Sequence, residues 1–302
     1  MRDVTIIEVG PRDGLQNEPG FIPTDKKLQL IRTLIEAGVN RLEATSYVHP
    51  QRVPQMADAA EIMGALSEEK GVSLSALVPN LKGFERARAH RLDEVNWVSA
   101  ASETFNARNI NQTVEENIRA FEQLVAKAKQ EGIKVRFSIA TSFGCPFEGR
   151  IDQEQVIRLV ERALQAGADE IGIADTIGIA VPDQVFQLCS RVLQISGSVP
   201  IAVHLHDTRG LALANVYAAY SAGIRMFESA VGGLGGCPFA PGAAGNVATE
   251  DVVYLFERMK VRTGLDFSKL LDASELAVGL SQRKALGRIR LVEDKWNPTF
   301  HF

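Results

Sequence analysis

Residues 165–175, QAGADEIGIAD, join two different kinds of hydrophobic pattern. The preceding stretch, 153–166, repeats apolar residues at helical spacing and stops at a glycine, which is typical of the end of a helix. A short apolar run of strand type, 170–173, comes next, and a second helical pattern, 182–196, follows it. The same helix stop recurs at Ala37-Gly38 and Ala222-Gly223. The sequence therefore repeats a unit of strand and helix.

Eight such units lie between residues 4 and 262. The predicted strands are 4–9, 41–45, 73–77, 94–98, 135–139, 170–173, 201–205 and 226–230. The predicted helices are 24–37, 54–70, 81–90, 113–131, 153–166, 182–196, 211–222 and 249–262.

Strict alternation with short connections predicts parallel strands joined by right-handed crossovers. Eight units within about 250 residues match a TIM (β/α)8 barrel. A doubly wound sheet is the alternative, but it usually stops near six strands and needs a phosphate loop after its first strand. The loop here, Gly10-Pro11-Arg12-Asp13-Gly14, lacks that chemistry. We therefore predict an α/β fold of the TIM-barrel type.

A single catalytic domain is predicted for residues 1–302, because no linker rich in Pro, Gly or Ser divides the chain. The barrel is expected over about 4–262, with a C-terminal helical extension over about 263–302. Helical patterns occur there at 267–271 and 273–286. The apolar face of the second pattern either covers the barrel or pairs two subunits, and we expect a homodimer.

Charge and cysteine content indicate the environment of the chain. Lys and Arg number 33 against 37 Asp and Glu, a formal net charge of −4, so nothing favours nucleic acid or an anionic membrane as a partner. Three widely spaced cysteines without a CxxC pair favour a reducing compartment over a disulfide framework. We find no leader pattern and no apolar run of about eighteen residues. A cytoplasmic location is expected.

Two histidines at the end of the seventh predicted strand give the strongest chemical signal. His204 and His206 stand at i and i+2, so both imidazoles face the same side of the strand. In a TIM barrel the carboxyl end of a strand lies at the active site. The alternative is that both histidines are hydrogen-bonded within a polar layer of the core and bind no metal. We favour a metal centre.

Oxygen donors for such a centre are available at other strand ends. Asp13 follows the first strand, and Asn246 follows a glycine-rich loop after the eighth. Two imidazoles with oxygen donors and no thiolate suit Mg²⁺ or Mn²⁺, although the same set does not exclude Zn²⁺. Asp207 alternates to the opposite face of the strand and is expected to make a structural hydrogen bond.

The loop after the eighth predicted strand carries six glycines between Val231 and Asn246. It lacks the pattern of a nucleotide-binding loop and predicts a segment that closes over a ligand. Cys237 within it is a candidate acid or base, against the alternative of a small packed residue. Arg12 suits the stabilisation of a developing oxyanion, against the alternative of a surface ion pair. Glu43 points inward and is either catalytic or an anchor for Arg12.

Seven segments, taken together and in this order, carry a family resemblance. They are 8–17 (EVGPRDGLQN), 53–56 (VPQM), 80–85 (NLKGFE), 144–149 (GCPFEG), 175–178 (DTIG), 204–208 (HLHDT) and 232–238 (GGLGGCP), the last continuing to Gly245-Asn246. The chain resembles the 3-hydroxy-3-methylglutaryl-CoA lyase family of metal-dependent TIM-barrel lyases over nearly all of residues 4–262.

The resemblance implies cleavage of a 3-hydroxy-3-methylglutaryl thioester into acetyl-CoA and acetoacetate, with an acyl-CoA as substrate. It implies Arg12 as the oxyanion partner, Glu43 as the support of Arg12 and Cys237 as the catalytic acid or base. The metal ligands that it implies are Asp13, His204, His206 and Asn246.

Three departures from the family pattern bear on substrate binding. Leu205 stands where relatives often carry cysteine, but it is expected to face away from the site. Pro19 replaces a lysine of some relatives, which puts a contact with the CoA phosphates in doubt there. Residues 141–143, Thr-Ser-Phe, differ from the Cys-Ala-Leu of others and are expected to reshape the acyl pocket.

Further polar residues at strand ends complete the candidate site. His204 is a candidate base as well as a metal ligand, and Asp175 is a further catalytic candidate. Gln16, Thr176 and Ser142 are the candidates for substrate binding.

Two other functions compete with this lyase. The first is a related barrel lyase or synthase that acts on another hydroxy-acyl thioester, such as a citramalyl or methylmalyl thioester. A condensing synthase of the isopropylmalate type is less favoured, because His206 is followed by Asp207-Thr208 and only about forty residues follow the barrel. The second is a non-catalytic metal-binding barrel, which explains the two histidines but not the glycine loop with Cys237.

Overall fold

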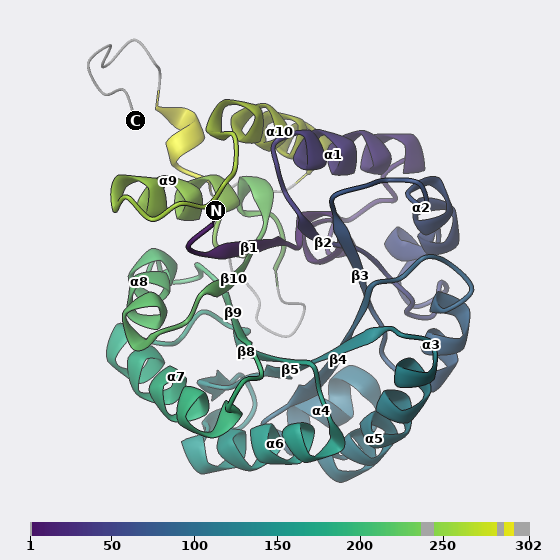
Figure 1. Ribbon diagram of the computed structural model, residues 1–302, viewed down its shortest axis with the longest axis vertical. Helices are drawn as coiled ribbons and strands as arrows, with labels where there is room; N and C mark the ends of the chain where they lie inside the picture. Colours follow the sequence, from purple (N-terminus) through teal and green to yellow (C-terminus); the bar gives the residue numbers. More distant parts are fainter. Residues whose placement is uncertain (1, 237–244, 283–286, 293–302) are drawn as a thin grey trace.

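A computed structural model of the chain describes residues 2–236, 245–282 and 287–292. Eight parallel strands close into a barrel in the order β1-β10-β9-β8-β5-β4-β3-β2, and helices form a ring around it (Figure 1). The strands are β1 (Thr5–Glu8), β2 (Arg41–Ser46), β3 (Ser73–Leu77), β4 (Glu94–Ala100), β5 (Lys134–Ala140), β8 (Glu170–Asp175), β9 (Ile201–Leu205) and β10 (Met226–Ser229). The predicted TIM barrel is confirmed.

The helices connect these strands on the outside of the barrel. They are α1 (Thr24–Glu36), α2 (Ala59–Ala65), α3 (Leu81–Ala87), α4 (Glu103–Ile110), α5 (Val114–Gln130), α6 (Gln153–Ala166), α7 (Pro182–Ser196), α8 (Ala212–Ala222), α9 (Thr249–Arg258) and α10 (Phe267–Leu280). Among the described residues, no helix combines the length and apolar character needed to cross a membrane.

Local signals fix most of these boundaries. The glycine that follows α1, α6 and α8 adopts a left-handed conformation, with φ of 94° at Gly38, 92° at Gly167 and 115° at Gly223. A side chain with a Cβ is disfavoured in that conformation, so the glycine ends the helix and turns the chain toward the next strand. The predicted helix stops therefore act where the sequence indicated.

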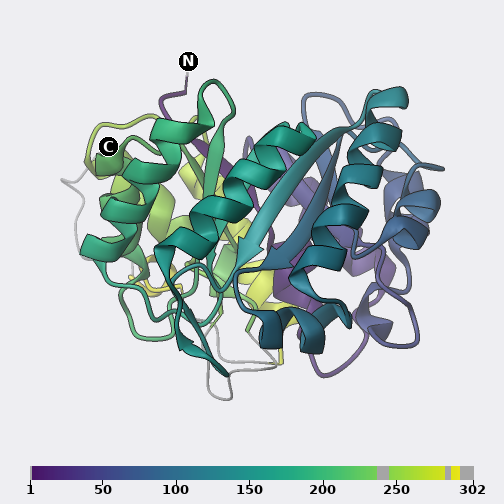
Figure 2. The same cartoon turned by 90° about the horizontal axis from the view of Figure 1, so that it is seen from below.

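Several elements differ from the sequence prediction. The predicted helix 54–70 is a 3-10 turn, Pro54–Met56, followed by the shorter α2. α4 was not predicted; Ser102 caps its first turn and Asn111 ends it with φ of 56°. A short antiparallel hairpin, β6 (Gly144–Cys145) and β7 (Gly149–Arg150), follows β5 and projects from the carboxyl end of the barrel (Figure 2). The helical patterns at 267–271 and 273–286 form one helix, α10, over the residues described.

β1 leads directly into a π-helical turn, Gly10–Gly14, that presents the Arg-Asp pair. The carbonyl oxygen of Val9 accepts the N–H groups of Arg12, Asp13 and Gly14 at 3.1, 2.7 and 3.3 Å. One acceptor therefore holds the whole turn at the end of the strand. This arrangement directs Arg12 and Asp13 over the mouth of the barrel.

Glu8 joins this turn to the glycine-rich segment after β10. Its buried carboxylate accepts the N–H of Gly10 at 2.6 Å, the N–H of Val231 at 3.0 Å and the hydroxyl of Thr249 at 2.6 Å. Burial raises the pKa of Glu8 to about 7, although these three donors oppose the rise. One carboxyl group thus fixes the turn after β1, the segment after β10 and the start of α9.

The C-terminal helices brace the same region from outside. α10 packs between α1 and α9 (Figure 1). Glu250, in the first turn of α9, accepts the hydroxyl of Ser274 at 2.7 Å and the N–H of Gly232 at 3.0 Å. The extension therefore contacts the glycine-rich segment and supports one wall of the barrel mouth.

A pair of glycine substitutions tests how tightly the Arg-Asp turn packs. A Cβ at Gly14 would lie 2.9 Å from Cβ of Leu234, whereas a Cβ at Gly64 in α2 meets nothing within 4 Å. Gly14→Ala should lower the free energy of unfolding by about 1–3 kcal/mol through overpacking. Gly64→Ala, the matched control, should raise it by about 0.5–1 kcal/mol. Urea unfolding of both variants measures this; equal midpoints would contradict it.

The raised pKa of Glu8 predicts a pH-dependent stability. An unfolded glutamate titrates near 4.3, so folding stability is lost as pH rises from about 4.3 through about 7. Glu8→Gln removes this titration while its amide oxygen can still accept the N–H groups of Gly10 and Val231. The variant should therefore gain on the wild type with rising pH, by on the order of 3 kcal/mol above pH 8. Parallel stability curves from pH 5 to 9 would refute this.

Candidate metal centre and active site

A cavity of about 350 Å³ opens at the carboxyl ends of the barrel strands. Of the residues predicted from the sequence, those that line it are Arg12, Asp13, Gln16, Thr176, His204 and His206. Residues of the strand interiors and of α4 complete the wall, among them Asn96, Ser138, Phe105, Asn109 and Ile110. The barrel thus brings predicted residues from three strand ends, those of β1, β8 and β9, to one site.

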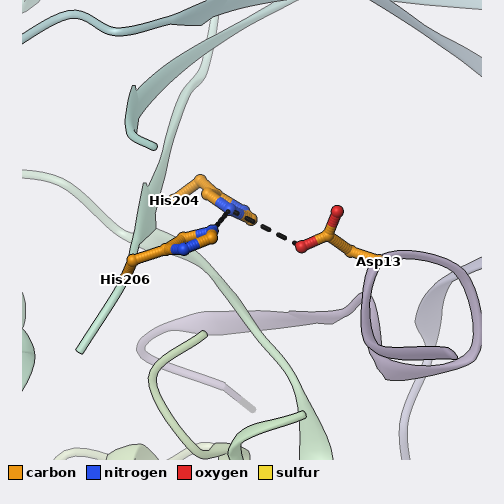
Figure 3. A group of neighbouring side chains, drawn as sticks. All are labelled: Asp13, His204 and His206. Carbon is orange, nitrogen blue, oxygen red and sulfur yellow. Dashed lines mark hydrogen bonds and ion pairs between the residues drawn. The ribbon is translucent and has the colours of Figure 1, made fainter. Parts of the chain in front are cut away.

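His204 and His206 extend from the end of β9 toward Asp13, which lies on the turn after β1 (Figure 3). Their Nε2 atoms are 3.0 Å apart, and Nε2 of His204 is 4.0 Å from Oδ2 of Asp13. One ligand atom from each of the three residues lies within 4.8 Å of the others. Both histidines therefore face the cavity, as the i, i+2 spacing predicted.

Asp13 is held by neighbours on both oxygens. Nη1 of Arg12 lies 2.5 Å from Oδ1, and Nδ2 of Asn246 donates to Oδ2 at 2.8 Å. Burial opposes ionisation, but Arg12 and the two histidines lower the pKa of Asp13 to about 2. Asp13 is therefore an anionic oxygen donor at neutral pH.

His204 is oriented from behind by a carboxylate that the sequence analysis missed. Its Nδ1 donates to Oε2 of Glu228 at 2.8 Å. Burial lowers the pKa of His204, but Glu228 and Asp13 raise it above its usual value. A metal ion must compete with that proton, so binding would release it.

The donor set fits a divalent cation. Two imidazole nitrogens and a carboxylate converge, and one imidazole carries a carboxylate on its other nitrogen, as metal-bound histidines usually do. The carbonyl oxygen Oδ1 of Asn246 is buried and has no hydrogen-bond partner among the described residues. Asn246 therefore offers a fourth donor beside Asp13.

Arg12 is itself fixed by a buried carboxylate. Its Nε donates to Oε1 of Glu43, and Nδ2 of Asn96 donates to the other oxygen, Oε2, at 2.7 Å. Glu43 is fully buried and does not line the cavity. Of the two roles considered for Glu43, this geometry supports the anchor of Arg12.

Asp175 and Ser142, like Glu43, do not line the cavity. Both carboxylate oxygens of Asp175 accept backbone N–H groups, from Ile179 at 3.0 Å and Ala180 at 2.9 Å, so the side chain folds into the loop after β8. The hydroxyl of Ser142 donates to the carbonyl of Ile139 at 2.7 Å. Asp175 and Ser142 therefore stabilise loops beside the site, and neither lines it.

Leu205 and Asp207 lie as the sequence predicted, whereas the structure does not describe Cys237. Leu205 is buried in the core, away from the cavity. Asp207 accepts the N–H of Ala212 at 3.0 Å, which is the structural hydrogen bond that was expected. Cys237 lies outside the described residues; Gly236, just before it, lines the cavity.

The residues that sequence reasoning missed differ in the signal they offer. Glu228 is the one charged residue in the predicted strand 226–230, and Asn96 is a polar residue within the predicted strand 94–98. Both could have been flagged as inward-facing polar groups. α4 has no comparable signal, because its apolar residues show no helical period.

Comparison with known proteins identifies the family of this chain. The HMGL-like family model matches residues 3–277. The mitochondrial hydroxymethylglutaryl-CoA lyase of Macaca fascicularis is 42% identical over 288 residues, which cover 95% of this chain and 89% of that protein.

Two solved structures share the fold over almost the whole chain. The HMG-CoA lyase of Bacillus subtilis superimposes with a TM-score of 0.92 and 42% identity, covering 96% of this chain and 97% of the other. An HMG-CoA lyase from Acinetobacter baumannii, in complex with coenzyme A and 3-methylmalate, gives a TM-score of 0.91 and 41% identity, covering 95% and 93%. With the converged histidine–aspartate cluster at the barrel mouth, these matches establish that the chain belongs to the HMGL-like family.

Proposed function

We propose that the cavity is the active site of a divalent-metal-dependent carbon–carbon lyase that splits 3-hydroxy-3-methylglutaryl-CoA into acetyl-CoA and acetoacetate. The observation that carries the proposal is the convergence of Asp13, His204 and His206 beside Arg12, in a chain of the HMGL-like family. An acyl-CoA is the proposed partner. The homodimer and the cytoplasmic location stay predictions from the sequence.

The proposed metal ligands are Asp13, His204, His206 and Asn246. Mg²⁺ or Mn²⁺ is the proposed ion, because oxygen donors accompany the imidazoles and no thiolate is among them. A divalent cation in such a site supplies Lewis acidity, which lowers the pKa of an alcohol that reaches it.

The reaction requires a proton to leave the C3 hydroxyl of the substrate. The proton acceptors in the cavity lining include His204, Asp13 and Glu228, and the imidazoles of His206 and His49 lie there as well. As the hydroxyl becomes the ketone of acetoacetate, the C2–C3 bond breaks and its electron pair moves into the thioester as an enolate. Gln16 and Thr176, which line the cavity, are the proposed substrate contacts.

Arg12 and Cys237 complete the proposed reaction. Nε and Nη1 of Arg12 are engaged by Glu43 and Asp13, so we assign the remaining guanidinium donors to the oxygen on which charge develops. Cys237 is assigned the delivery of a proton to the enolate carbon, which gives the methyl group of acetyl-CoA. That assignment rests on the family resemblance and on its place in the glycine-rich loop.

A second substrate class has one specific observation in its favour. The Acinetobacter relative binds 3-methylmalate together with coenzyme A, and a methylmalyl thioester would combine the two. The residues around Tyr47, His49 and Thr141 are where the acyl pocket is expected to differ between such substrates. His49 lines the cavity, whereas Thr141 does not.

Product identification tests the proposed activity directly. Purified protein with Mg²⁺ or Mn²⁺ should release acetyl-CoA and acetoacetate in equal amounts from 3-hydroxy-3-methylglutaryl-CoA. Citramalyl-CoA and methylmalyl-CoA serve as comparison substrates, and condensation is assayed in reverse. Faster cleavage of a comparison thioester would establish the alternative substrate. No cleavage of any thioester, together with intact metal binding, would favour a non-catalytic metal-binding barrel.

Three substitutions should separate metal binding from chemistry. His206→Ala should lower metal stoichiometry, because the neighbouring Leu205 and Asp207 are turned to other contacts. Cys237→Ala should keep the metal and lose about 10²–10⁴-fold in kcat if it transfers a proton in the rate-limiting step. Arg12→Gln should also keep the metal and lose kcat, because the charge it stabilises develops only in the transition state. Full turnover by Cys237→Ala would remove the cysteine from the mechanism.

A further inference from the structure

Glu228 contacts one of the predicted metal-binding imidazoles, that of His204, from within the layer of barrel strands. It lies on β10, whose backbone register places it directly beside His204 on β9. The side chain is 5% exposed and its Oε2 accepts Nδ1–H of His204 at 2.8 Å. The contact is therefore set by strand pairing, which leaves little freedom to the pair.

This hydrogen bond determines which nitrogen of His204 faces the cavity. A carboxylate only accepts, so the proton of the neutral imidazole must sit on Nδ1. The lone pair then lies on Nε2, the atom 3.0 Å from Nε2 of His206. Of the two imidazole tautomers, only this one offers His204 as a ligand to an ion between the three residues.

The other oxygen of Glu228 is held from across the barrel. Nη1 of Arg136, on β5, donates to Oε1. Arg136 is fully buried and also pairs with Glu94 and Glu170, and Arg41 bridges those two carboxylates at 2.5 and 2.7 Å. Glu228 thus stands between a fixed guanidinium and His204, with neither oxygen free to turn away.

We propose that Glu228 is a positioning residue that holds His204 as an Nε2 metal ligand, and that Arg136 sets its orientation. The inference rests on the proposed function of the site, but it concerns metal binding and needs no substrate to be tested.

Glu228→Gln gives the sharpest test, because it keeps the shape of the side chain and reverses the hydrogen bond with Nδ1 of His204. Arg136 has only donors, so the amide oxygen must turn to Arg136 and the amide N–H groups to His204. Nδ1 would then have to accept, which places the proton on Nε2. Mn²⁺ affinity, measured by titration calorimetry without thioester, should fall about 10–100-fold. Long-range ¹H–¹⁵N spectra of the metal-free protein should show the tautomer exchanged.

Two further variants separate positioning from a general loss of charge. Glu170→Gln removes a carboxylate of the same buried layer that does not contact His204, and Glu94 still holds Arg136. It should bind Mn²⁺ within about twofold of the wild type. Glu228→Asp keeps the acceptor, so it should retain the Nδ1–H tautomer and lose less affinity than Glu228→Gln.

Metal affinity and the tautomer of His204 decide whether Glu228 has this role. Wild-type Mn²⁺ affinity in a folded Glu228→Gln, or an equal loss in Glu170→Gln, would overturn the inference. If Glu228→Gln does not fold, as judged by thermal unfolding and circular dichroism, then a folded Glu228→Asp with the Nε2–H tautomer overturns it instead. A protein that shows all the expected Mn²⁺ effects and cleaves no thioester would refute the proposed function and leave this inference standing.

Discussion

A fully buried guanidinium inside the barrel constrains the architecture around it. Arg136 lies where a TIM barrel ordinarily stacks apolar side chains, and moving its charge out of water carries a large desolvation penalty. Three carboxylates, from β4, β8 and β10, offset that penalty. Together these carboxylates hold the guanidinium of Arg136 in place from three strands. The barrel interior is therefore rigid directly beneath the site.

That rigidity extends to the reacting groups in two directions. Glu228, which Arg136 holds, in turn orients His204 by a hydrogen bond. Glu43, which accepts a hydrogen bond from Asn96, holds Arg12 in the same way. The pKa of Glu228 falls to about 2 because Arg136 and His204 outweigh the effect of burial, so it stays an acceptor at neutral pH. Arg12 and His204 thus each have a buried carboxylate behind them, which preorganises the site before substrate arrives.

Local patterns were enough to predict the fold, whereas part of the site depends on contacts between distant residues. Hydrophobic periodicity and helix-ending glycines such as Gly167 are local, and they gave the eight units. The spacing of His204 and His206 was likewise local. The partnership of His204 with Glu228 follows from the register of β9 and β10, which no single strand encodes. Asp175 was misplaced because a strand end predicts nearness to the site, but its carboxylate is taken by the next loop.

The cavity wall supplied by α4 has a consequence for how such enzymes diverge. Phe105, Asn109 and Ile110 reach the cavity from a short helix inserted between β4 and α5. The insertion is anchored at its start by Ser102 and contributes no strand to the barrel. Asn106 ties this helix to the barrel by accepting the N–H of Ala100 on β4 at 3.2 Å, whereas Asn109 and Ile110 can change over generations without disturbing the buried charges. A connection of this kind lets a lineage explore new acyl groups while it inherits the bond-breaking centre unchanged.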